Sequence, residues 1–561
     1  MRPASTVAVE TETDMRTPID RFSFAPSAVR LVRWPDRPGE VFIWALLIAT
    51  GLRAFSFGTT GLDWDESFYI VVAQRWLNGG VPYADVWDIH PMGVPALFAV
   101  GTWIIGDGLV AARVAALFAV AGTAALLCVF LDRYTRTRPA GILAGCFYLA
   151  YMARPEGLAA NTEVFNNLMV TAASFLLAGQ SVIAYRAARP GPMFVASLLF
   201  GIGLQLKYVV FPEAVALCGT VLIWELGGGA PIRRTAGLAA ISVAGGLLPT
   251  VVAALYFWQA GALQPYLDAT LRANVAYLEE PLGLGMALMR LRYGLLPIAG
   301  LLIWPVVLLI LERRHRLSRR QRVVSLWLTI WLVAACVDVA MPLKFWKHYF
   351  NALVPPLCLM AGFALTLLAR RSRPRFAGIM AAGVMLTLIP AVAEITLHAR
   401  DSRNIGRANV PREIAERIRA EGSNGRDVYV FNYDPLVYVY ARSAPPSRFV
   451  LGVELSDYTA SAGTSAEAEI GRILRGPPRW IVVARPSPYS YPEPVLRELG
   501  DALRDYQRES TYQETDYIQP PIEVSLYRRR AQRVGDEGAR ERPDSPSARD
   551  APRGDAVGSR S

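Results

Sequence analysis

Residues that could carry out acid–base or metal chemistry gather in one short segment, 61–91, which reads GLDWDESFYIVVAQRWLNGGVPYADVWDIHP. Its candidates are five carboxylates, one tyrosine and one histidine: Asp63, Asp65, Glu66, Asp85, Asp88, Tyr83 and His90. A carboxylate can take the proton of an attacking hydroxyl or amine, and carboxylates grouped with a histidine can hold a metal ion. The segment therefore predicts acid–base chemistry or metal binding.

A short helix is expected to present the first of these residues. Asp65 and Glu66 precede an apolar-periodic run that stops at Gly79, so both fall in the first turn of an amphipathic helix. The apolar residues between 68 and 76 share one face, which predicts a helix lying on the membrane surface. A second helix is expected over 91–106. The two acidic residues could also serve only as capping charges, which is a common use of such residues at a helix start.

The composition is that of a polytopic membrane protein. Of the 561 residues, 53% are hydrophobic, which exceeds what a soluble domain of this size carries. The formal net charge is +11, but the arginines cluster between apolar runs, where they act as topology signals, so no nucleic-acid partner is expected. All five cysteines lie in apolar runs without paired spacing, which excludes a disulfide framework and a zinc site. No apolar run precedes residue 41, so the first span is expected to be an uncleaved anchor.

The apolar runs predict about eleven membrane-spanning helices. They are expected at 41–58, 109–131, 139–153, 164–184, 193–206, 209–226, 236–258, 294–311, 323–341, 351–369 and 376–396. The arginine-rich loops between them fall on one side, which places the N-terminus in the cytoplasm of a plasma (inner) membrane protein. The loop at 59–108, the turn KFWKHYF and everything after 397 are then expected on the extracytoplasmic side.

The sequence predicts two ordered domains and two disordered ends. Residues 1–38 mix proline, serine and charges without periodicity, and the tail 531–561 is similarly polar, so both are expected to be disordered. The membrane module spans 39–398. In 399–530, the segments DVYVFN, RWIVVAR and IEVSLYR predict strands that alternate with helical stretches, which indicates a small extracytoplasmic α/β domain with a structural or acceptor-positioning role.

The order of the loop motifs resembles the polyprenyl-phosphate-dependent GT-C glycosyltransferases: DE, an aromatic residue, a small-residue helix, GG-x-P-Y-x-D, then H-P before an apolar helix. It is similar to the family 39-like group, which includes protein mannosyltransferases and lipid A aminoarabinose transferases. The resemblance covers roughly residues 40–365 and implies a catalytic aspartate in the first extracytoplasmic loop, at Asp65. It also implies a second acidic residue, which Glu163 matches by position and Glu156 matches less well. The chain departs from the family's Pro-Pro pattern at Pro91-Met92.

Three further sites have two interpretations each. Lys207 is expected at the tip of a broken apolar hairpin, where it could contact a carrier phosphate or extend to the membrane interface. Glu163 could act chemically or only favour the start of the fourth span. The turn MPLKFWKHYF could contact a phosphate or metal, or anchor the chain at the interface, through Lys344, Lys347, His348 and Tyr349.

These expectations combine into a membrane glycosyltransferase, either hexosyl- or pentosyltransferase. The short cytoplasmic loops hold no nucleotide-binding fold, so the donor is expected to be a polyprenyl-phosphate-linked sugar from the bilayer and the acceptor an extracytoplasmic glycan, lipid or protein. Asp65 would act as the general base, and Asp63-Trp64-Asp65 could hold Mg²⁺ or Mn²⁺. A polytopic transporter or lipid flippase is the alternative, and a membrane scaffold for the C-terminal domain is a third. The densest polar cluster lies in an outer loop, which favours the enzyme.

Overall fold

The computed structural model describes residues 37–530, except 60–61, 181–182, 184–186, 280–281, 315–316, 372–374, 406–408, 424, 487–490 and 515–521. Disorder was predicted for 1–38 and 531–561. Of these residues, 1–36 and 531–561 lie outside the described part of the chain. The chain divides into two compact units, Met1–Asn409 and Val410–Ser561.

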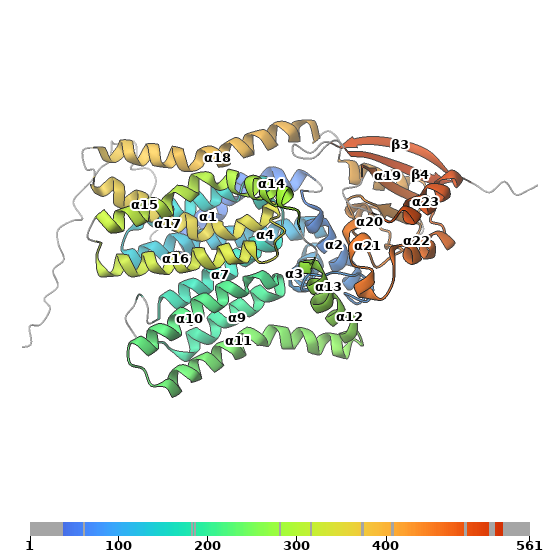
Figure 1. Ribbon diagram of the computed structural model, residues 1–561. Helices are drawn as coiled ribbons and strands as arrows, with labels where there is room; N and C mark the ends of the chain where they lie inside the picture. Colours follow the sequence, from blue (N-terminus) through green and yellow to red (C-terminus); the bar gives the residue numbers. More distant parts are fainter. Residues whose placement is uncertain are drawn as a thin grey trace, which may run out of the picture. The chain divides into compact units, whose positions relative to one another are not determined.

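The first unit is a bundle of long apolar helices (Figure 1). Its long helices are α1 (Pro38–Arg53), α4 (Gly108–Thr135), α5 (Arg138–Tyr151), α7 (Thr162–Ala178), α9 (Pro190–Leu206), α10 (Phe211–Gly227), α11 (Ile232–Gln259), α15 (Ala299–Arg314), α16 (Arg319–Ala340), α17 (Val354–Arg371) and α18 (Phe376–Ile405). Helix α17 is nearly all buried, and it packs against α5, α15 and α18. Helices α9 and α11 pack against each other, and α7 contacts both α4 and α9.

Eight helices among the described residues are long and apolar enough to cross a membrane. They coincide with eight of the eleven expected spans, and the chain is a multi-pass membrane protein. The other three runs, expected at 139–153, 164–184 and 193–206, form α5, α7 and α9, which have 14, 17 and 17 residues. These helices are shorter than the 20 or so residues that span a bilayer without tilt.

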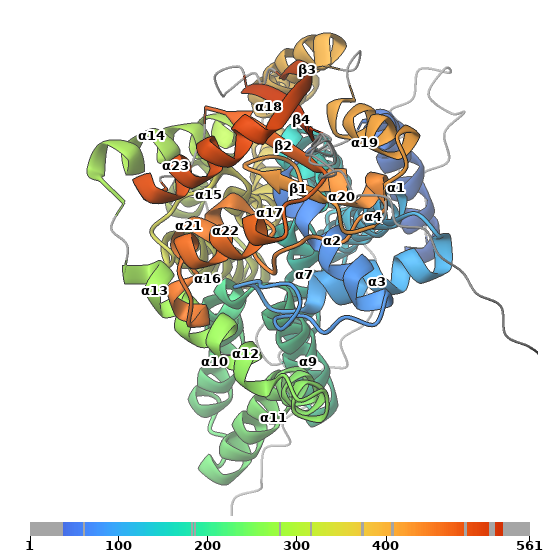
Figure 2. The ribbon, with the colours of Figure 1, turned by 90° about the vertical axis from the view of Figure 1, so that its right-hand side faces the viewer.

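Shorter elements occupy one end of the long helices, where Figure 1 shows α2, α3, α12 and α13, and Figure 2 looks onto this end. These elements are η2 (Ala54–Gly58), α2 (Trp64–Leu77), α3 (Gly93–Ile105), α6 (Pro155–Leu158), η3 (Tyr208–Val210), α12 (Leu263–Leu267), η4 (Asp268–Arg272), α13 (Ala273–Glu279), α14 (Leu284–Leu295), η5 (Leu296–Ile298) and η6 (Lys347–Leu353). They contain the connections that hold most of the predicted site residues.

The helix expected at the DE motif is present as α2, but it does not lie on a membrane surface. Its residues from Glu66 to Ala73 are buried on every side, and it packs between α3 and α4. The prediction of a surface helix was wrong because the apolar face of an amphipathic helix looks the same in sequence whether lipid or protein covers it.

The second unit is built around a four-stranded mixed sheet in the order β1-β2-β4-β3. Its elements are α19 (Val410–Ala420), β1 (Val428–Phe431), α20 (Leu436–Ala441), α21 (Gly452–Asp457), η8 (Ala460–Ala462), α22 (Ala466–Arg475), β2 (Trp480–Arg485), α23 (Glu493–Ala502), η9 (Leu503–Asp505), β3 (Tyr506–Glu514) and β4 (Ile522–Arg529). Strands β1 and β2 are parallel, and β4 pairs antiparallel with both β2 and β3. The three strands predicted from sequence are β1, β2 and β4.

Candidate active site

The start of α2 places two aspartates side by side. Asp63 is the N-cap residue, and its Oδ1 accepts a hydrogen bond of 2.9 Å from the backbone N–H of Asp65. Its Oδ2 accepts another, also of 2.9 Å, from the side-chain amide of Asn161, which precedes α7. Asp63 is therefore fixed from two elements, while Asp65 keeps about a third of its side chain exposed.

A histidine and a second acidic loop close around these aspartates. The carboxylates of Asp63 and Glu156 and one ring nitrogen of His348 each offer a ligand atom, and these atoms lie within 4.8 Å of one another. Asp65 Oδ2 lies 3.9 Å from His348 Nε2. Two carboxylates and one imidazole form a donor set that suits a divalent cation. We call Asp63, Asp65, Glu156 and His348 the acidic cluster. The structure thus joins residues that were predicted from separate parts of the chain.

Burial shifts the pKa values of two carboxyl groups in the acidic cluster. Burial raises the pKa of Asp63 to about 7, and the charge of Asp65 adds to this effect. Burial also raises the pKa of Glu156, although the nearby His348 and Lys347 oppose it. A carboxylate that titrates near neutral pH can exchange a proton or a cation in the physiological range.

Glu66 is placed differently from its neighbour Asp65. Its side chain is fully buried, and both of its oxygens receive hydrogen bonds of 3.1 Å from Arg113 on α4. Arg113 also donates to the carbonyl oxygens of Ser56 and Thr59. Glu66 was predicted as a catalytic residue, and its geometry is that of a group that anchors α2 to α4, where Arg113 also holds η2.

The loop that bears Glu156 is held by Arg53 on one side and by Asn351 on the other. Arg53 donates to the carbonyl oxygens of Met152, Gly157 and Leu158, at 2.9, 2.5 and 2.7 Å. On the other side of the loop, the side-chain amide of Asn351 donates to the carbonyl oxygen of Glu156 at 2.7 Å.

Asn351 is in turn held by Arg154. Arg154 Nη2 donates to Asn351 Oδ1 at 3.1 Å, and Arg154 Nη1 pairs with Glu394 of α18 at 3.2 Å. Because Asn351 and His348 share η6, this network fixes the loop of Glu156 relative to the turn of His348.

A second cluster combines cations with aromatic rings, and we call it the basic-aromatic cluster. Lys207 caps the end of α9, and its Nζ lies 2.5 Å from Glu163 Oε1 and 3.6 Å from the centre of the Tyr349 ring. Tyr349 and Tyr277 bring their hydroxyls to 3.3 Å. Lys344 Nζ lies 4.5 Å from the centre of the Tyr277 ring.

The basic-aromatic cluster borders the acidic cluster through two consecutive residues, His348 and Tyr349, whose rings meet edge to face. Lys207 and Glu163 are both buried, so the lysine does not extend to a membrane interface. Lys347, the third lysine of the basic-aromatic cluster, lies over the ring of Tyr293 on α14.

The remaining candidates in the first loop form a third group. Asp88 is buried, and its Oδ1 accepts from both the backbone N–H and Nδ1 of His90, at 2.8 and 2.9 Å. Burial raises the pKa of Asp88, while the charge and hydrogen bonds of Asp88 outweigh burial and raise the pKa of His90. Tyr83 is buried and donates to the carbonyl oxygen of His90. Asp85 stands apart, where it accepts from the backbone N–H of Val81 and lies 3.6 Å from Arg75.

Comparison with solved structures identifies the architecture of the chain. The crystal structure of ArnT from Cupriavidus metallidurans bound to undecaprenyl phosphate matches with a TM-score of 0.55 and 17% identity, over 86% of this chain and 98% of that one. The chain has the fold of ArnT. The apo ArnT structure matches with a TM-score of 0.54 and 17% identity, over 86% of this chain and 97% of that one.

A weaker match joins these two. The oligosaccharyltransferase of Archaeoglobus fulgidus in its apo form has a TM-score of 0.44 and 10% identity, over 80% of this chain and 69% of that one. No protein-family model and no curated protein sequence matches the chain. The resemblance to GT-C glycosyltransferases that the loop motifs indicated is confirmed by the ArnT fold.

Several residues that support the candidate site were not predicted from the sequence. Arg113, Arg154, Asn351 and Tyr277 were not predicted, although all four contact a candidate residue or its loop. One signal was available for Arg113, because an arginine inside a long apolar run must find an acidic or carbonyl partner. Asn351 and Tyr277 carry no comparable signal.

Proposed function

We propose that the protein is a membrane glycosyltransferase that moves a sugar from a polyprenyl-phosphate-linked donor to an extracytoplasmic acceptor. The observation that carries the proposal is the acidic cluster at one end of an ArnT-like bundle, with a partly exposed Asp65 beside His348. Undecaprenyl phosphate is bound to the ArnT of the matching structure, and it is a carrier of the proposed chemical class.

Asp65 is the proposed general base. In the reaction, Asp65 takes the proton of an acceptor hydroxyl or amine while the acceptor atom forms a bond to the anomeric carbon of the sugar. The bond from that carbon to the phosphate oxygen breaks, and its electron pair leaves with the polyprenyl phosphate. Asp65 is more accessible than Glu66, whose two oxygens are occupied by Arg113, so a proton can reach Asp65 from an acceptor.

The acidic cluster would also hold a divalent cation. Asp63, Glu156 and His348 would supply its ligands, and an ion there would stabilise negative charge on the departing phosphate. Lys207, Lys344 and Lys347 would supply further positive charge from the basic-aromatic cluster. Glu163 and Tyr349 would position Lys207, and the third group of Tyr83, Asp88 and His90 would line the donor side with Asp85 at its edge.

The test uses the purified full-length protein and a panel of polyprenyl-phosphate sugars. Release of free polyprenyl phosphate that requires both the protein and an acceptor would support the proposal. Movement of intact donor across a vesicle membrane without its cleavage would instead establish a lipid flippase. Asp65→Asn is the matched control, since it keeps the size and hydrogen-bonding capacity of the side chain and removes the proton acceptor.

A further inference from the structure

The second unit contains a hollow at one end of its sheet. Its volume is about 460 Å³, and it lies where β1 and β2 begin and where β4 ends. The residues that line it come from three connections: Arg426, Asp427, Gly476, Pro477, Pro478, Arg479, Arg529 and Arg530. None of these residues belongs to the proposed glycosyltransferase site, which lies in the first unit.

The backbone around the hollow is fastened by hydrogen bonds between the three connections. The N–H of Trp480 donates to the carbonyl oxygen of Asp427 at 2.8 Å, and the N–H of Arg529 donates to that of Arg479 at 2.8 Å. The hydroxyl of Tyr506 donates to the carbonyl oxygen of Pro478 at 2.5 Å. Two consecutive prolines stiffen the connection before β2 further. The side chains of the hollow therefore project from a preorganised platform.

The charge of this platform is strongly positive. Four arginines face one aspartate, a formal excess of three positive charges, and Asp427 already accepts a hydrogen bond of 2.6 Å from the hydroxyl of Ser423. Arg479 donates a hydrogen bond to the carbonyl oxygen of Gly422. Glu421 lies 3.8 Å from Arg479 and only 2.8 Å from Arg528, so Arg528 is its closer partner. Arg529 and Arg530 are exposed, and within the described residues no acidic side chain forms an ion pair with either of them.

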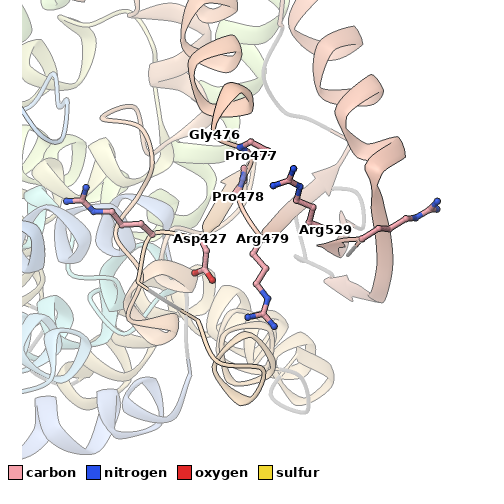
Figure 3. Close-up of a pocket in the computed structure, with 8 residues that line it drawn as sticks. Asp427, Gly476, Pro477, Pro478, Arg479 and Arg529 are labelled. Atoms are coloured by element: carbon pink, nitrogen blue, oxygen red, sulfur yellow. The ribbon is translucent and has the colours of Figure 1, made fainter. Parts of the chain in front are cut away.

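The arrangement of the arginines suggests an extended anion. In Figure 3, the side chain of Arg479 extends to one side together with Asp427, while that of Arg529 lies on the other side, beside Pro478. Guanidinium groups that point in different directions can each contact a different anionic group along a chain.

We propose that this hollow, which we call the arginine hollow, binds a polyanionic polymer such as a glycan with repeated phosphate or carboxylate groups. Each guanidinium would donate hydrogen bonds to one anionic group, and the polymer would be held by several weak contacts at once. The binding does not depend on the proposed glycosyl transfer, and it can be measured with inactive protein.

The test titrates full-length protein in an uncharged detergent into fluorescently labelled polyphosphate and polygalacturonate, with neutral dextran and inorganic phosphate as comparisons. Fluorescence anisotropy should show saturable binding of both polyanions that weakens with added salt, much weaker binding of inorganic phosphate and none of dextran. Arg529→Gln/Arg530→Gln should weaken polyanion binding by about tenfold or more, because each charged hydrogen-bond donor is lost.

A matched variant separates a site from general attraction to a basic protein. Arg497→Gln/Arg504→Gln removes the same charge from exposed arginines of the same unit, which pair with Glu493 and Asp501. Equal weakening by the two double variants, or no weakening by Arg529→Gln/Arg530→Gln, overturns the proposal. A membrane partner would also overturn the proposal. In that case neither polyanion binds, whereas vesicles of phosphatidylglycerol and phosphatidylcholine bind wild-type protein but not Arg529→Gln/Arg530→Gln.

Discussion

The neighbours Asp65 and Glu66 should respond to neutralisation in opposite ways. Asp65→Asn removes the proposed base from a side chain that is about one-third exposed, so the fold should survive. General base catalysis contributes about 10²- to 10⁴-fold, and turnover should fall by that order with little change in donor binding. Glu66→Gln instead removes a charge from a fully buried pair and should reduce stability.

The size of the stability loss follows from the surroundings of Arg113. Breaking a buried ion pair typically costs about 3 to 5 kcal/mol, because the remaining charge is left without its partner. Here Arg113 keeps the carbonyl oxygens of Ser56 and Thr59 as acceptors, and glutamine keeps one acceptor of its own, so we expect a loss at the lower end, about 3 kcal/mol.

Both quantities can be measured on detergent-purified protein, as thermal unfolding and as release of polyprenyl phosphate. Arg113→Gln alone should also destabilise the protein, and the double variant Glu66→Gln/Arg113→Gln should recover part of the loss, because no buried charge is then left unpaired. Wild-type stability of Glu66→Gln together with turnover as low as that of Asp65→Asn would refute the reasoning, since Glu66 would then take part in the reaction.

Other predictions follow from the same geometry. Lys207→Met should weaken use of the donor, but it also leaves Glu163 buried without its cation. The double variant Lys207→Met/Glu163→Gln should therefore restore folding but not donor use. Donor affinity equal to that of wild type in the double variant would show that Lys207 does not contact the phosphate. Asp63 has a pKa raised from 3.8 to about 7, so its folded state binds the proton more tightly, and cation-free stability should fall as pH rises from about 4 to about 7. Mn²⁺ affinity, measured by calorimetry, should fall by at least about tenfold for each pH unit below 7, because a proton must leave before the cation binds. Both pH dependences should be shallower in Asp63→Asn, where only the raised pKa of Glu156 remains, and dependences as steep as those of wild type would contradict the assignment to Asp63. Arg154→Gln should lower turnover more than donor binding, since Asn351 loses one of its anchors, and a loss of stability with unchanged turnover per folded molecule would limit Arg154 to a structural role. A cysteine in place of Ser461 should react with a membrane-impermeant thiol reagent in intact cells if the second unit is extracytoplasmic, whereas labelling only after lysis would reverse that topology; wild-type protein measures the background from its own five cysteines.

The sequence predicted those parts of the fold that depend on short-range patterns. Helix α2 begins at the expected DE motif because Asp63 supplies its cap, and β1, β2 and β4 were recognisable as apolar runs. Strand β3, Tyr506–Glu514, was not predicted, because it is largely polar and half-exposed and shows no apolar alternation.

The sequence indicated which loops hold the candidate residues but not how those residues pair. The shared location of Asp65 and His348 followed from the topology of the loops. The ion pairs of Glu66 with Arg113 and of Glu163 with Lys207 join residues 47 and 44 positions apart, and no single-sequence pattern specifies such partners. As a result, two carboxylates that sequence analysis placed among catalytic or substrate-binding groups have their charge balanced by a buried cation.

The pair of Arg154 and Glu394 bears on how this protein could be divided. Glu394 belongs to α18, whose residues up to Ile405 precede the second unit. A truncation that ends before Glu394 would remove the partner of Arg154 and so disturb the turn that holds His348, even though the deleted residues lie outside the acidic cluster. A junction at 406–409 would keep the pair intact. The second unit could then be exchanged for that of a related chain as a module, with α18 retained as part of the first unit.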